Sequence, residues 1–169
     1  MKKLSRHDQR YLDAAEGWLG LGDLLSANDE LEQITPELRT HPTVLAVKLE
    51  IHWTAKKWEA CIEITNVLVR LEPYNDHAWI GRSFALHELK RTQEAFDLLL
   101  LAKDKFPKNC TIPYNLACYC AQLNRLEDAH DWLKKAMKIE ERSVKRMAIH
   151  DPDLKPLRDS MGEKLWKRE

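Results

Sequence analysis

Small residues recur at a fixed interval of 34 residues along most of the chain. One such register is occupied by Ala27, Cys61, Ala95 and Ala129, and mostly apolar residues return four and seven positions after each of them. These spacings bring side chains onto one face of an α-helix. With only five glycines and no alternating β-type runs, the pattern predicts an all-α protein built from a repeated helical unit.

Turn signals divide each period into two helices. They stand at Gly22-Asp23, Lys56-Lys57, Lys90-Arg91 and Asn124-Arg125. We expect the first helices of the units near residues 8–21, 42–55, 76–89 and 110–123. The second helices should follow near residues 24–34, 58–71, 92–105 and 126–140. A hairpin of this size cannot bury its apolar stripe alone, so neighbouring hairpins must stack on it.

The chain continues past the fourth unit with a different pattern. Residues 143–150 read as one more short helix, and the two prolines of DPDLKPL interrupt it. Asp153 is a candidate N-cap for a last helix over residues 153–166. We interpret this region as a cap that shields the open end of the stack.

The 34-residue period resembles that of the tetratricopeptide repeat family, over roughly residues 8–141. Tyr11, Leu45 and Trp79 match the family's large residue early in the first helix, whereas Pro113 stands where an aromatic residue is usual. The resemblance implies a right-handed α-solenoid of about four helical hairpins with a C-terminal capping helix region. The chain would form a single domain over residues 1–169, with repeats at 8–41, 42–75, 76–109 and 110–143 and a cap at 144–169.

In such a stack the first helices line a concave groove, where a partner peptide or helix binds. The family's groove register implies contacts from Ala46, Glu50, Trp53, His77, Ile80, Phe84, His87, Tyr114, Asn115 and Cys118. We expect Trp53, Phe84 and Tyr114 to be exposed anchors for that partner, unless neighbouring helices or the cap cover them. Apart from Asn115, the groove lacks the lysine and asparagine residues with which related co-chaperones hold a C-terminal carboxylate, which disfavours a chaperone tail.

The cysteines are interpreted as packing residues. Cys61 lies in the alanine register, and Cys120 lies midway along a first helix, where Cys118 faces the opposite side. A redox or metal-binding role is the alternative, and it would require thiols activated by nearby positive charge. The seven histidines show no metal-like grouping. We therefore expect no metal, no cofactor and no enzymatic activity.

Charge adds one alternative function. Lysine plus arginine equals aspartate plus glutamate at 27 each, so a nucleic-acid partner is not expected. The basic C-terminal stretch presents Lys164, Trp166, Lys167 and Arg168, and such a segment can contact an anionic membrane or polymer surface; a solvated helix end is the plainer interpretation. Neither a secretory signal nor a membrane span is evident, so we expect a cytoplasmic protein.

Two stretches narrow the resemblance. WIGRSFALHELKRTQEA at 79–95 and YNLACYCAQLNRLEDA at 114–129 are similar to compact bacterial tetratricopeptide proteins described as kinesin-light-chain-like. Because proteins of that group associate with a bacterial tubulin cytoskeleton, the resemblance implies a tubulin-like filament as the specific partner.

Overall fold

The computed structural model describes residues 3–162, and these residues form helices and turns without a strand. The all-α prediction is confirmed. By their internal contacts the residues divide into two compact units, Met1–Ala78 (unit 1) and Trp79–Glu169 (unit 2). The division falls inside α5 (Asp76–Glu88). The single domain expected from the sequence stays a prediction.

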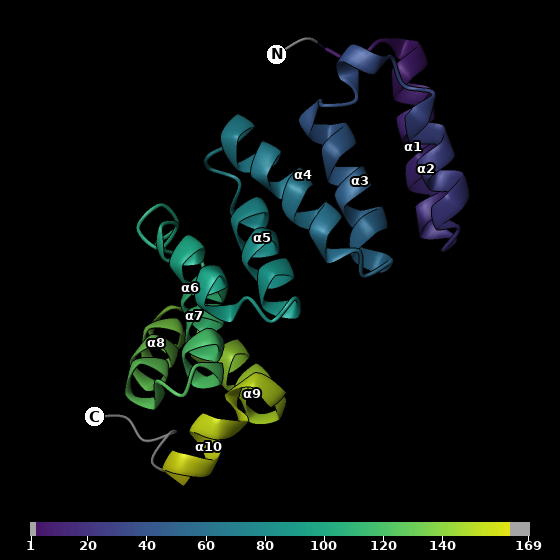
Figure 1. The fold of residues 1–169 in the computed structure, drawn as a ribbon. Coiled ribbons are helices and arrows are strands. Elements are labelled where there is room, and N and C mark those ends of the chain that lie inside the picture. Colours follow the sequence, from purple (N-terminus) through teal and green to yellow (C-terminus); the bar gives the residue numbers. More distant parts are fainter. Residues whose placement is uncertain (1–2, 163–169) are drawn as a thin grey trace. The chain divides into compact units, whose positions relative to one another are not determined.

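Unit 1 consists of two helical hairpins (Figure 1). Its elements are α1 (Arg6–Gly20), α2 (Leu24–Glu32), the 3₁₀ turn η1 (Pro36–Leu38), α3 (Pro42–Thr54) and α4 (Trp58–Leu71). Within the hairpins α1 packs on α2 and α3 on α4, and α3 also packs on α1 and α2. A core of buried apolar residues that includes Leu12, Leu31 and Val47 joins the two hairpins.

A buried carboxylate fixes the beginning of unit 1. Asp8 is only 1% exposed, and its Oδ2 accepts a hydrogen bond from the Ser5 hydroxyl at 2.5 Å. Its Oδ1 accepts hydrogen bonds from the Thr35 backbone N–H and hydroxyl, both at 2.8 Å. These bonds lower the pKa of Asp8 to about 2. The TPELRTHP extension of the first repeat is thereby tied to α1.

Unit 2 contains the remaining hairpins and the C-terminal segment. After α5 follow α6 (Thr92–Leu100), α7 (Thr111–Gln122), α8 (Leu126–Ile139), α9 (Glu141–His150), the 3₁₀ turn η2 (Pro152–Leu154) and α10 (Lys155–Met161). α7 packs against α6, α8, η2 and α10. Nearly every side chain of α7 is therefore buried.

The alanine register lies at the tightest points of the hairpins. Ala27, Cys61, Ala95 and Ala129 are all 0% exposed. Each stands in the second helix of its unit, three residues after the helix begins. The packing role predicted from the 34-residue period is confirmed.

The four helix-to-helix turns are built alike. Gly22, Lys56, Lys90 and Asn124 have positive φ, at 80°, 54°, 64° and 59°. The next residue in each turn donates its backbone N–H to a carbonyl five residues back, at 2.8–3.0 Å. This is the Schellman arrangement, which satisfies the last carbonyls of the first helix.

Two details differ from the sequence predictions. α6 ends at Leu100 instead of continuing to residue 105, because the backbone bonds at Ala102, Lys103 and Lys105 span only three residues. The cap of the C-terminal turn is Asp151, whose Oδ1 accepts from the Asp153 backbone N–H at 2.9 Å. The assignment of Asp153 as that cap was wrong.

Candidate functional site

The first-helix face of unit 1 retains accessible groove residues. On α3, Ala46 and Glu50 are exposed, and Trp53 is half-buried. The Trp53 ring packs edge-to-face on Trp58 of α4, with ring centroids 5.3 Å apart and planes at 84°. α4 therefore orients Trp53 while leaving part of its surface accessible.

α5 presents a second set of candidates. His77 is exposed, with its Nε2 3.9 Å from Asp76. Farther along, Ile80 and Phe84 are half-buried, and so is Asn115 on α7. These positions are compatible with the predicted groove contacts, which stay predictions.

The same face of α7 is covered by the protein's own C-terminal segment. Tyr114 is 6% exposed and Cys118 is 4% exposed. The Tyr114 hydroxyl donates to Asp151 Oδ2 at 2.6 Å, and Cys118 Sγ lies 3.7 Å from the same oxygen. Gln122 Nε2 donates to the Asp153 carbonyl at 2.8 Å. The expectation that Tyr114 is an exposed anchor was therefore wrong.

His87 of α5 is covered by the same segment. It is 6% exposed, its Nδ1 lies 3.0 Å from Thr92 Oγ1, and its Nε2 lies 3.1 Å from Asp153 Oδ2. Leu154 and Leu157 are both fully buried. We call residues 151–157 the cap segment, because they fill the face on which a partner was expected.

Burial keeps the polar groups beneath the cap segment neutral. Burial and the hydrogen bond to Asp151 raise the pKa of the Tyr114 phenol. Burial and the nearby Asp151 carboxylate raise the pKa of the Cys118 thiol well above its ordinary value. Both groups remain protonated at neutral pH and can donate to Asp151.

The other cysteines also have raised thiol pKa values. Burial is the main cause for Cys61 and Cys110, and it raises the pKa of Cys120 to about 11. A reactive cysteine requires the opposite shift. Cys61 and Cys120 are fully buried, as their packing role predicts, and all four cysteines are free.

Other observations concern metals, membranes and the C-terminus. Within residues 3–162, no group of three His, Cys, Asp or Glu side chains is arranged to hold a metal ion. No helix in that part of the chain is long and apolar enough to cross a membrane. The predicted surface-contact residues Lys164, Trp166, Lys167 and Arg168 lie outside the described residues.

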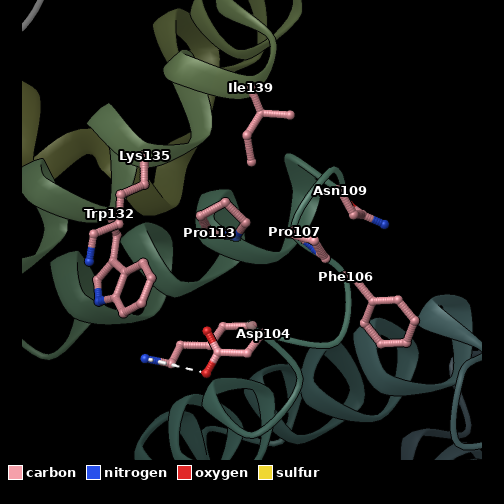
Figure 2. A pocket seen from close by; sticks show the side chains of 9 residues that line it. Asp104, Phe106, Pro107, Asn109, Pro113, Trp132, Lys135 and Ile139 are labelled. Atoms are coloured by element: carbon pink, nitrogen blue, oxygen red, sulfur yellow. Dashed lines mark ion pairs between the residues drawn. The ribbon is translucent and has the colours of Figure 1, made fainter.

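The sequence analysis missed a pocket on unit 2 (Figure 2). It lies between the α6–α7 connection and α8, has a volume of about 290 Å³, and is lined in part by Phe106, Pro107, Pro113, Trp132 and Ile139. The only sequence signal was the aromatic residue before a proline at Phe106-Pro107. The register analysis had assigned that proline to the end of a repeat.

Comparison with known proteins places the fold. No protein-family model matches the chain. The chain is 24% identical over 122 residues to the anaphase-promoting complex subunit CDC16 of Saccharomyces cerevisiae, and the match covers 70% of this chain but only 14% of that protein.

Two solved structures show the similarity in three dimensions. A tetratricopeptide repeat protein from Parabacteroides merdae is 18% identical, with a TM-score of 0.76 over 93% of this chain and 62% of that one. MamA from Desulfovibrio magneticus RS-1 is 15% identical, with a TM-score of 0.73 over 93% of this chain and 92% of that one. With the 34-residue period and the four hairpin turns, these matches establish that the chain has the tetratricopeptide repeat fold.

Proposed function

We propose that this chain is a non-enzymatic adaptor that binds a peptide or helix of a partner protein on the first helices of its repeats. The observation that carries the proposal is the accessible face of α3 in unit 1. There a half-buried tryptophan, Trp53, stands beside the exposed residues Ala46 and Glu50. Partly exposed aromatic side chains held by their neighbours are the usual anchors of protein interfaces.

In unit 2 the proposed contacts are Ile80, Phe84 and Asn115. His87, Tyr114 and Cys118 can contribute only when the cap segment leaves α7. His77 at the beginning of α5 completes the proposed set. The partner is a protein, because the site offers apolar and aromatic surface with few charges.

The test is a titration of the partner captured from the native cell. Trp53→Ala and Phe84→Ala should each weaken binding about thirtyfold, which corresponds to a loss of about 2 kcal/mol. Trp18→Ala is the matched control, because Trp18 is 39% exposed in unit 1 but lies outside the groove register. If the two groove variants bind as tightly as the control, the first-helix site is refuted.

A bacterial tubulin-like filament is the specific partner that we propose to test first. Its support is the resemblance of residues 79–95 and 114–129 to kinesin-light-chain-like bacterial proteins. Co-sedimentation of the purified chain with polymerised filaments, beside unpolymerised subunits, tests it directly. Saturable binding that Trp53→Ala abolishes would support the proposal, and absence of co-sedimentation would remove this partner.

The alternative is a bridging protein whose basic ends contact an anionic surface. It predicts that added salt steeply weakens partner binding. It also predicts that Lys164→Glu with Lys167→Glu abolishes binding while Trp53→Ala has no effect. The same titrations at low and high salt therefore separate the two functions.

A further inference from the structure

We propose that the pocket between the α6–α7 connection and α8 is a second binding site, which takes an acidic peptide segment presenting one aromatic or branched apolar side chain. The inference goes beyond the proposed function, because no residue that lines this pocket belongs to the groove register. A protein with both sites could hold two segments at once.

The walls of the pocket are apolar and stiff. Pro113 is built into the first turn of α7, Pro107 lies in the preceding connection, and Trp132 projects from α8 (Figure 2). The proline rings have fixed backbone angles, and the α8 backbone is helical, so the cavity is formed before a ligand arrives. A preformed site loses little conformational entropy on binding.

The size of the pocket indicates what can enter it. A volume of about 290 Å³ is at the lower limit of small-molecule sites, which are about 300–1,000 Å³. This space suits one large side chain of a peptide better than a nucleotide or cofactor. Phe106, Ile139 and Trp132 would contact such a side chain on several sides.

Cations stand at the same cavity. Lys135 Nζ lies 3.8 Å from the centroid of the Trp132 ring, a cation–π contact that holds an ammonium group beside the apolar wall. Lys103 also lines the pocket and lies 3.9 Å from Asp104, whose side chain is 89% exposed. One exposed carboxylate at that distance leaves Lys103 able to meet a second one.

The charge of the surrounding sequence favours an acidic ligand. Residues 103–108 and 132–139 supply all but two of the lining residues, and together they contain six lysines and one aspartate, a net charge of +5. The whole chain has a net charge of zero. This local excess of positive charge would steer an acidic segment to the pocket and fix its register.

The experiment uses the full chain and a defined probe, the acetylated and amidated peptide Asp-Asp-Phe-Asp-Asp. Binding is followed by two-dimensional ¹H–¹⁵N NMR. We expect saturable shifts of the Trp132 indole N–H and of backbone amides in residues 103–109. A peptide with alanine in place of phenylalanine, and one with serine in place of aspartate, should each bind about tenfold more weakly or not at all.

Charge reversals test the lysines. Lys103→Glu and Lys135→Glu should each weaken the probe about tenfold. Lys138→Glu is the matched control, because Lys138 is an exposed lysine on the same helix that does not line the pocket. An equal loss with Lys138→Glu would mean diffuse attraction and would overturn the assigned site.

Other occupants are separated in the same measurement. Titrations with oligothymidylate and with phosphatidylserine vesicles should leave the Trp132 indole resonance unchanged. The proposal is overturned if either shifts that resonance while the peptide does not, or if the peptide produces no saturable shift at millimolar concentration. Trp53→Ala should leave the peptide titration unchanged, so failure of this site is distinguishable from failure of the first-helix site.

Discussion

At the scale of single residues, unit 1 depends on one buried carboxylate. Asp8 accepts three side-chain and backbone hydrogen bonds from Ser5 and Thr35, which lower its pKa from 3.8 to about 2. Because the folded pKa lies below the unfolded one, the ionised carboxylate stabilises the fold above about pH 4. That contribution is lost as the pH falls from about 4 to about 2.

Replacement of Asp8 tests this linkage. Asp8→Asn should lower the free energy of unfolding at pH 6, and the difference from the wild type should shrink as the pH approaches 2. Urea unfolding across this pH range measures it. Asp13→Asn, on the exposed side of the same helix, is the control. A difference that stays constant with pH would contradict the role assigned to the carboxylate.

The alanine register makes a second residue-scale prediction. Ala95 is fully buried at the closest approach of its hairpin, so Ala95→Leu should cost about 1–3 kcal/mol by overpacking. Ala46→Leu is the same substitution at an exposed position and should be nearly neutral. Thermal unfolding compares them, and equal midpoints would show that residue 95 has room for a larger side chain.

At the scale of elements, the four hairpin turns share one geometry but not one residue. Gly22 meets the positive φ of this position without a Cβ penalty, whereas Lys56, Lys90 and Asn124 do not. Lys90→Gly should therefore stabilise the protein by about 1 kcal/mol. Lys57→Gly, at a neighbouring position with φ −86°, should destabilise it. Urea unfolding of both variants gives the sign, and destabilisation by Lys90→Gly would contradict the strain argument.

The cap segment makes the second element-scale prediction. The Tyr114 hydroxyl donates to the Asp151 carboxylate at 2.6 Å, and a hydrogen bond to a charged group contributes about 1.5–3 kcal/mol. Tyr114→Phe should therefore let the segment leave α7 more often and expose Cys118. In a variant whose only cysteine is Cys118, the thiol should react faster with an aromatic disulfide reagent.

The control for this measurement is Tyr11→Phe, which keeps the ring that packs edge-on against His7. Its thiol reaction should proceed at the rate of the parent protein. Equal rates in all three proteins would show that the hydroxyl does not hold the cap segment in place.

At the scale of the whole molecule, repeats stabilise their neighbours and little else. Asp8→Asn should reduce amide hydrogen-exchange protection mainly in residues 3–78, and Leu157→Ala mainly in residues 79–162. Leu157 is fully buried, and its truncation should cost about 2–5 kcal/mol. Exchange measured by mass spectrometry on peptic fragments checks both. A uniform loss of protection throughout the chain would indicate one cooperative domain, as the sequence analysis expected.

The sequence by itself determined the repeated elements. Helix length, the turns at Lys56 and Lys90, and the buried register of Ala27 and Ala129 depend on contacts within one hairpin, which recur every 34 residues and leave a periodic trace. The match of α4 with the expected residues 58–71 shows how far such local patterns reach.

Tertiary structure decided what those helices present to a partner. Tyr114 has the same register as Ala46 and Ile80, yet it is buried, because Asp151 arrives from 37 residues away. The pocket likewise combines Phe106 with Trp132 and Ile139 from α8. Contacts between non-equivalent positions have no period, so the sequence pattern contains no signal for them. The α-helical repeat was therefore predictable, and its free surface was not.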